Sequence, residues 1–300
     1  MNTMHGSELA LWQAWLLAIR PRTLPAAVGP VLVGTALAVR DNAFTPLPAI
    51  AALVGALLIQ IGANLSNDYL DYVKGVDVAE RTGPRRVAQS GLIALPRLRL
   101  GIAVTFALAA MVGLYLVFIG GWPVLIIGLA SVLSALAYTG GPWPVGYHGL
   151  GDLFVFLFFG LAAVCGTYYV QALSISPVAV AAALPVGALT VAILVINNLR
   201  DIETDRKTGK RTLAVILGAG ATRLEYVLLL ALAYGTPLLF WLAGWSSPWV
   251  LLPWVSLPLA VHLVRSVYQI PGGPALNKLL AGTANLDLLY CILFAAGLVP

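Results

Sequence analysis

Long apolar segments recur along the whole chain, and they constrain its fold more than any other feature. We count nine of them, at 24–39, 49–66, 100–121, 122–138, 150–172, 177–197, 225–245, 249–265 and 279–298. Most approach the ~20 residues that an α-helix needs to cross ~30 Å of hydrocarbon. The alternation of apolar and polar residues that marks the strands of a membrane barrel is absent. The sequence therefore predicts one all-α domain over residues 1–300, a polytopic protein with about nine transmembrane helices and membrane lipid around it.

The charged residues are few and confined to the segments between these spans. Only 10% of the chain is charged and 60% is hydrophobic, whereas soluble domains average about 25% charged. The net charge of +5 belongs to loops of a membrane protein, so we expect anionic ligands and no nucleic acid. Cys165 and Cys291 lie inside apolar segments without metal-ligand spacing, and we expect neither a disulfide nor a zinc site.

Basic side chains gather on one side of the predicted membrane. Of the 17 Lys and Arg residues, 16 lie in the N-terminal segment or in the loops after the second, sixth and eighth spans, and only Arg40 lies on the other side. Cytoplasmic loops carry such an excess of positive charge. We therefore expect a multi-pass protein of the plasma (inner) membrane, with a cytoplasmic N-terminus and the C-terminus outside.

Two short stretches, 67–81 and 197–211, hold most of the acidic side chains. They contain seven of the 12 acidic residues: Asp68, Asp71, Asp77, Glu80, Asp201, Glu203 and Asp205. Both follow apolar spans on the predicted cytoplasmic side, and both carry neighbouring Lys and Arg residues. A chain that avoids charge elsewhere and concentrates it here is expected to bind a charged ligand at the membrane edge.

The spacing of these polar residues fits one face of a helix in each stretch. The first set is Asn64, Asn67, Asp68 and Asp71, at i, i+3, i+4 and i+7, and the second is Asn198, Asp201 and Asp205. Solvated charges that merely end two spans would not need this repeated pattern. Clustered oxygen ligands suit Mg²⁺, which takes one or two carboxylates and fills its other positions with water and phosphate. The pattern therefore predicts a diphosphate held through Mg²⁺.

Five motifs in this order resemble the UbiA-type membrane prenyltransferases. Two are the acidic stretches, NDYLDYVKGVD and NNLRDIETDRKTGKRTLAV; the others are RPRTLPAAVGPVLVGTALA at 20–38, GPRRVAQSGLI at 83–93 and YTGGPWPVGYHGLGDL at 138–153. Together they are similar to the branch that prenylates 1,4-dihydroxy-2-naphthoate in menaquinone biosynthesis. The sequence departs from many relatives at Gly75, where they carry a third aspartate, and after Tyr138, where they carry a lysine.

The resemblance implies helices around a central cavity that is open to lipid. It also implies Mg²⁺-dependent transfer of a polyprenyl group from polyprenyl diphosphate to dihydroxynaphthoate, with loss of CO₂ and diphosphate. The expected metal ligands are Asp68, Asp71, Asp77, Asp201 and Asp205. The expected substrate contacts are Asn67, Asn198, Tyr72 and the basic residues Arg22, Lys74, Arg81, Arg86, Arg200 and Lys210.

Three of the expected site residues have a second interpretation. Arg22 is a candidate for binding the carboxylate of the acceptor, or else an anchor on the cytoplasmic side. Asp152 is a candidate for orienting or deprotonating the acceptor hydroxyl, or else an N-cap. Tyr138 is expected to offer a π face to an allylic cation, although tyrosines are common at any membrane interface.

Two alternative functions remain open from the sequence. A UbiA-type enzyme with 4-hydroxybenzoate or another aromatic acceptor would carry the same aspartate motifs. A secondary transporter or cation channel is an alternative of a different class. Such proteins place charges at mid-membrane depth, whereas nearly all charges here lie at one predicted membrane face.

Overall fold

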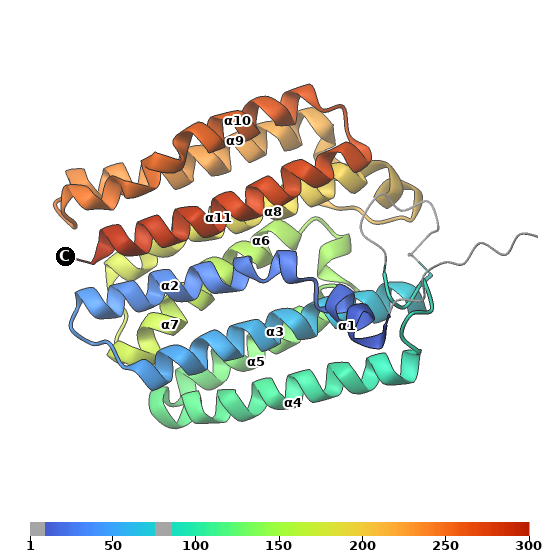
Figure 1. Cartoon of the computed structure of the whole chain (residues 1–300), viewed down its shortest axis with the longest axis horizontal. Coiled ribbons are helices and arrows are strands. Elements are labelled where there is room, and N and C mark those ends of the chain that lie inside the picture. Colours follow the sequence, from blue (N-terminus) through green and yellow to red (C-terminus); the bar gives the residue numbers. More distant parts are fainter. Residues whose placement is uncertain (1–9, 76–85, 300) are drawn as a thin grey trace, which may run out of the picture.

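A computed structural model describes residues 10–75 and 86–299, and these are helical apart from their connections (Figure 1). The helices are α1 (Leu11–Ile19), α2 (Pro25–Arg40), α3 (Pro46–Val73), α4 (Leu95–Gly120), α5 (Trp122–Ala137), α6 (Gly151–Val155), α7 (Ala163–Ala172), α8 (Pro177–Lys207), α9 (Leu213–Leu242), α10 (Leu257–Gln269) and α11 (Leu276–Leu298). Short turns of 3₁₀-helix occur at η1 (Pro21–Thr23), η2 (Val145–Tyr147), η4 (Pro248–Ser256) and η5 (Gly273–Ala275), and a π-helical segment, η3 (Phe156–Ala162), joins α6 to α7.

The helices account for the expected membrane spans. Within the described residues, seven are long and apolar enough to cross a bilayer; α1–η1 and α2 form a pair bent by 49°, and α5 is a shorter apolar helix. If the bent pair and α5 are included, these elements match the nine apolar segments of the sequence. The prediction of an all-α, multi-pass membrane protein is confirmed, although the exact number of spans stays approximate.

Helix α8 lies at the centre of the bundle and α4 at its edge. Within an 18-residue apolar stretch of each helix, 72% of the residues of α8 are buried inside the protein, but only 6% of those of α4. Small side chains let neighbours approach α8 closely: a Cβ added at Gly160 of η3 would lie 2.8 Å from the Cα of Gly187 in α8. Exposed apolar residues such as Phe118, by contrast, cover α4. These faces are suited to lipid, which does not penalise them as water does.

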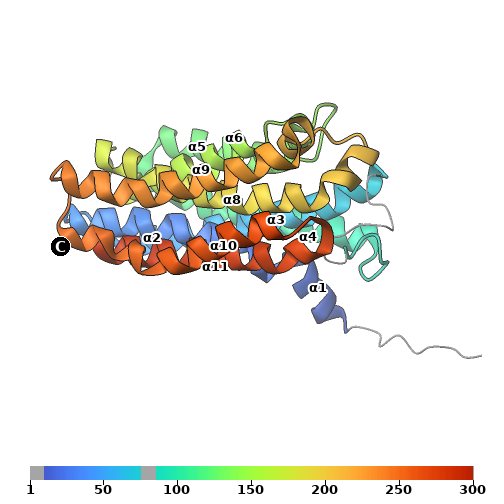
Figure 2. The same ribbon diagram turned by 90° about the horizontal axis from the view of Figure 1, so that it is seen from above.

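The two helices that carry the acidic motifs, α3 and α8, end at the same end of the bundle (Figure 1). The described chain ends at the opposite end, and α1 projects from the bundle near the motif end (Figure 2). Prolines at the first positions of α3 and α8 preset the helical φ angle. Ser176 caps α8 by accepting a hydrogen bond from the Ala179 amide at 3.1 Å. Alternating helix directions therefore bring both motifs to one face.

Helix α9 begins earlier than its apolar segment suggests. The hydropathy pattern predicted a span from residue 225, but α9 starts at Leu213, where Thr212 accepts a hydrogen bond from the Val215 amide at 3.4 Å. The backbone breaks at Gly218, which has a φ of 80° that favours glycine. Arg223 fixes this region by donating to the carbonyls of Val267, Ile270 and Pro271. The first turns of α9 therefore extend the span by a short apolar segment that precedes the break at Gly218.

Candidate active site

A cavity of about 1510 Å³ is lined by residues of α1 to α8 and of α11. On α3 its lining residues run from Ala52 to Asp71, a length of about 28 Å at 1.5 Å per residue. The cavity therefore extends through most of the ~30 Å thickness of a bilayer core. Away from the motif end it is lined mainly by apolar side chains, among them Phe106, Leu116 and Phe158. Such a space suits a long apolar chain.

Polar residues from both acidic motifs meet at one end of this cavity. The lining residues there are Asn67, Asp71, Arg86, Tyr138, Tyr147, Asn197, Asn198, Asp201, Asp205 and Lys210. They come from the ends of α3 and α8 and from the segments around 86, 138–147 and 210. The structure thus brings together most of the residues that the motifs singled out.

Three groups from other segments surround the Asp71 carboxylate. A nitrogen of Arg86 lies 2.5 Å from it and Nζ of Lys210 lies 3.4 Å from it. The hydroxyl of Tyr147 donates a hydrogen bond to the same carboxylate. Lys210 also sits 4.6 Å from the centre of the Tyr147 ring. Through Lys210, this carboxylate therefore joins the first acidic stretch to the end of the second.

The neighbours of Asp71 on α3 have different environments. Asn67 lines the cavity, and its amide oxygen accepts a hydrogen bond from Thr139 at 2.6 Å. Asp68 is 1% exposed, does not line the cavity, and accepts hydrogen bonds from the backbone amides of Val87 and Ala88, both at 3.1 Å. Asp71 therefore faces the cavity, whereas Asp68 faces the backbone at residues 87 and 88.

The second motif is organised around Arg200, which is buried. Its guanidinium makes a two-point contact with Asp201, at 2.9 and 2.6 Å. It also donates to the side-chain oxygens of Asn197 at 2.8 Å and of Asn277 in α11 at 3.0 Å. Arg200 does not line the cavity, whereas Asn198, Asp201 and Asp205 do. Arg200 therefore sits behind the aspartate that faces the cavity.

Tyr138, directly after α5, and Asp152, the second residue of α6, lie close enough for the Asp152 charge to act on the Tyr138 hydroxyl. Tyr138 lines the cavity, and burial raises the pKa of its hydroxyl above the usual range, with the Asp152 charge adding to the effect. Asp152 is 8% exposed and does not line the cavity. Its Oδ2 atom has no hydrogen-bond partner within the described part of the chain. The pair therefore places an acid behind the tyrosine that faces the cavity.

The other predicted contacts are more scattered. Arg22 is exposed and lines the cavity, while Tyr72 is 41% exposed and does not line it. Nζ of Lys74 donates to the carbonyls of Thr139 and Gly141, at 2.7 and 3.0 Å; desolvation lowers the pKa of Lys74. Asp77 and Arg81 lie outside the described residues.

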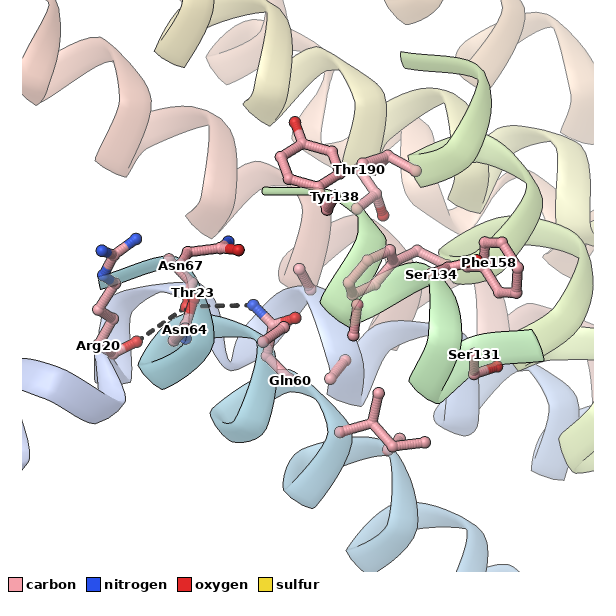
Figure 3. Close-up of a pocket in the computed structure, with 18 of the residues that line it drawn as sticks. Arg20, Thr23, Gln60, Asn64, Asn67, Ser131, Ser134, Tyr138, Phe158 and Thr190 are labelled. Carbon is pink, nitrogen blue, oxygen red and sulfur yellow. Dashed lines mark hydrogen bonds between the residues drawn. The ribbon is translucent and has the colours of Figure 1, made fainter. Parts of the chain in front are cut away.

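A polar network that the motifs did not reveal lines the same cavity beneath the first motif. The hydroxyl of Thr23 donates to the carbonyl of Arg20 at 3.0 Å and accepts from Asn64 at 2.9 Å and from Gln60 at 3.3 Å (Figure 3). Gln60 is polar within the apolar segment 49–66 and precedes Asn64 by four residues. A polar residue one helical turn before Asn64, inside an apolar span, is the sequence pattern by which Gln60 could have been identified as a site residue.

The polar end of the cavity has the donor chemistry of a magnesium site. Asp71, Asp201 and Asp205 present carboxylates there, together with the amide oxygens of asparagines on both helices. Such hard oxygen donors fit Mg²⁺, which needs few protein ligands when phosphate supplies others. In the described part of the chain, no group of three His, Cys, Asp or Glu side chains is arranged to hold a metal by itself.

Known proteins resemble this chain over nearly its full length. Residues 27–286 match the model of the UbiA prenyltransferase family. The 1,4-dihydroxy-2-naphthoate octaprenyltransferase of Escherichia coli (strain K12) is 40% identical, over 98% of both chains. That of Mycobacterium tuberculosis (strain ATCC 25618 / H37Rv) is also 40% identical, over 97% of this chain and 98% of that one.

A solved structure shows the same fold. A UbiA homolog from Archaeoglobus fulgidus bound to GPP and Mg²⁺ matches with a TM-score of 0.68 and 16% identity, over 95% of this chain and 99% of that chain. The family match, the similar relatives and the shared fold agree with the resemblance that the five sequence motifs predicted. The chain belongs to the UbiA prenyltransferase family.

Proposed function

We propose that this protein transfers a polyprenyl group from polyprenyl diphosphate to 1,4-dihydroxy-2-naphthoate, releasing diphosphate and CO₂ and giving demethylmenaquinol. The observation that carries the donor half is a cavity in which two aspartate motifs meet at one end of a long apolar space. The names of relatives that are 40% identical support the acceptor half. The Archaeoglobus homologue, bound to GPP and Mg²⁺, supports the metal.

The polar end of the cavity is suited to stabilise a departing diphosphate. Arg86 and Lys210 line it and place positive charge beside Asp71, where they can pair with phosphate oxygens. Asp71, Asp201 and Asp205 would hold Mg²⁺, with asparagine oxygens nearby, and the ion would add positive charge that neutralises the leaving group. Asp77 stays a prediction as a metal ligand, because it is outside the described residues, and Asp68, which the motif also suggested as a ligand, does not line the cavity.

The apolar part of the cavity protects the reacting carbon. When the C–O bond of the allylic diphosphate breaks, its electron pair leaves with diphosphate and an allylic cation remains. Tyr138 and Phe158, which line the cavity, offer π faces to that cation. Apolar surroundings exclude the water that would otherwise capture it. The tail of the donor then occupies the space along α3, α4 and α5.

The acceptor reacts at the ring carbon that carries its carboxylate. The new C–C bond forms there, and the electron pair of the C–CO₂ bond restores the aromatic ring as CO₂ leaves, so atoms and charge balance without a further oxidant. Arg22, which lines the cavity, is our candidate for holding the carboxylate beforehand. Asp152, whose charge acts on the hydroxyl of the cavity-lining Tyr138, is our candidate for orienting or deprotonating the acceptor hydroxyl.

We also propose that the motif end of the bundle faces the cytoplasm and that the described C-terminal end faces outward. The concentration of Lys and Arg at the motif end supports this orientation. Residues 1–300 would then act as one membrane-embedded catalytic domain.

An acceptor competition tests the proposal. Membranes containing the protein receive one polyprenyl diphosphate, Mg²⁺, dihydroxynaphthoate and 4-hydroxybenzoate together, and products are separated by mass. We expect a prenylated naphthoquinol that has lost the carboxyl group. If prenylated 4-hydroxybenzoate forms instead, the acceptor is not dihydroxynaphthoate. If no product forms and the protein in proteoliposomes shows metal-dependent ion flux, the transporter alternative is favoured.

A further inference from the structure

Asp68 and Asp71 look equivalent in the sequence but face different directions on α3. At 100° per residue, Asn67, Gln60, Asp71 and Asn64 fall within a sector of about 60°, and Asp68 falls about 40° beyond its edge. The four residues inside the sector line the cavity, whereas Asp68 does not. The helix itself therefore turns Asp68 toward a different neighbour.

That neighbour is a tight turn formed by residues 86–92. Within it, the Ser90 amide donates to the Arg86 carbonyl at 3.0 Å, and the Leu92 amide donates to the Val87 carbonyl at 3.0 Å. The amides of Val87 and Ala88 at its start donate instead to the two oxygens of Asp68. Both residues are buried, so water does not reach their amides, and the Asp68 carboxylate supplies the hydrogen-bond acceptors that they need. Asp68 thus caps the turn as an aspartate caps a helix.

The turn begins at Arg86, whose side chain reaches the cavity. One of its terminal nitrogens lies 2.5 Å from the Asp71 carboxylate, and the other donates to the Asn67 carbonyl at 2.6 Å. Because Arg86 directly precedes Val87, fixing the Val87 amide fixes the backbone from which this arginine extends. The contacts therefore form a path from Asp68 through the turn to Arg86 and Asp71.

We propose that Asp68 is a positioning residue that acts through Arg86, and that it is not a ligand of the metal. To reach a metal in the cavity, its carboxylate would have to release two buried amides, which would then lack acceptors at a cost in free energy. The inference rests on the proposed function of the cavity, in which Arg86 pairs with the diphosphate.

Loss of turnover does not separate the two roles, because both predict it. The first experiment therefore replaces each aspartate with cysteine, since a thiolate favours Cd²⁺ over Mg²⁺. For Asp71→Cys we expect the ratio of activity in Cd²⁺ to activity in Mg²⁺ to rise at least about tenfold over the unmodified protein. For Asp68→Cys we expect no change in this ratio. A comparable rise in Asp68→Cys would overturn the proposal.

The second experiment does not depend on turnover. Hydrogen exchange of the peptide covering residues 86–93 reports on the two capped amides, and Mn²⁺ binding followed by electron paramagnetic resonance reports on the metal. In Asp68→Ala we expect faster exchange in 86–93 and Mn²⁺ affinity within about twofold of the unmodified protein. In Asp71→Asn we expect Mn²⁺ affinity to fall at least about tenfold. Unchanged exchange in Asp68→Ala, or an equal loss of Mn²⁺ affinity, would contradict the inference.

Asp68→Asn provides the conservative control. Its amide oxygen can still accept one of the two backbone hydrogen bonds, so we expect partial recovery of both exchange protection and the KM for the diphosphate. Recovery no better than in Asp68→Ala would count against a capping role. If the unmodified protein transfers no prenyl group, the proposed function fails, while the exchange measurement still decides the role of Asp68.

Discussion

The two aspartate motifs share a spacing in the sequence but are held in place differently. In the first, Asp71 meets Arg86, Tyr147 and Lys210, which come from three segments outside α3. In the second, Asp201 is paired with Arg200, the preceding residue of the same helix. The first motif is therefore assembled by loops, and the second is largely built into α8.

The burial of the two helices explains this difference. α8 is packed on most sides, with 72% of its apolar window buried, whereas the value for α3 is 22%. A central helix fixes its own end, so Arg200 needs only Asn197 and the adjacent Asn277 to hold it. α3 lacks such packing, so its motif depends on surrounding loops. We therefore expect loss of Arg200, which is buried behind the second motif, to act mainly through stability, and loss of an aspartate that lines the cavity in either motif to act mainly through substrate binding.

The largest effect on stability should come from Arg200→Met. This change leaves the buried Asp201 carboxylate without its cation, and breaking a buried pair in this way costs about 3–5 kcal/mol. Thermal unfolding in detergent should show a large loss of stability together with loss of turnover. Arg200→Lys keeps the charge but not the two-point contact and should lie in between. A fully stable Arg200→Met protein would remove the distinction between the motifs.

The next largest effect should come from Asp71→Asn, and it should be on activity. Loss of this carboxylate from the polar end of the cavity should lower turnover by about 10²–10³-fold, the range observed when one group that stabilises a transition state is removed. The loss of stability should be smaller than in Arg200→Met, because Arg86 keeps its hydrogen bond to the Asn67 carbonyl. Turnover and unfolding temperature measured on one preparation separate these outcomes. If Asp71→Asn fails to fold and no folded but inactive protein is obtained, the comparison between the motifs is contradicted.

A smaller effect is expected for Lys210→Met. Its Nζ lies 3.4 Å from Asp71, farther than the 2.5 Å of Arg86. Loss of one charge-assisted contact is worth about 1.5–3 kcal/mol, so the KM for the diphosphate should rise about tenfold or somewhat more. Arg86→Met, measured in parallel, should have the larger effect. The reverse order would mean that the distance of each cation from Asp71 does not predict how much that cation contributes to diphosphate binding.

The smallest effect should come from Glu203→Gln, also in the second motif. Glu203 pairs with Arg206 at 3.2 Å, but the Glu203 side chain is 73% exposed. Exposed pairs contribute about 0–1 kcal/mol, so stability and turnover should both stay close to the values of the unmodified protein. A marked loss of activity would show that the acidic cluster acts as a whole and not through its buried members.

The sequence predicted the spans well because hydropathy is a local property of each segment. It missed the start of α9 at Leu213, since Thr222, Arg223 and Glu225 interrupt the apolar pattern, whereas the helical segment begins before them and is broken only at Gly218. It also predicted that the two motifs would meet, because alternating helices bring equivalent ends together. That prediction needed only the order and the alternating direction of the helices.

The roles within the motifs were harder to predict. Spacing placed Asp68 near the face that carries Asp71, but what Asp68 contacts there, the turn at 86–92, comes from a distant part of the chain. Lys74 looked like a diphosphate contact, yet it donates to the carbonyls of Thr139 and Gly141. These partners are distant in the sequence, so no local pattern could indicate them.

The central claim is that both motifs hold one diphosphate at the end of one cavity. Equilibrium binding of a polyprenyl thiolodiphosphate, which resists ionisation, tests this directly in the presence of Mn²⁺. We expect one analogue per chain, with binding weakened at least about tenfold by Asp71→Asn and equally by Asp201→Asn. Two analogues per chain, or unchanged affinity after either substitution, would contradict the account.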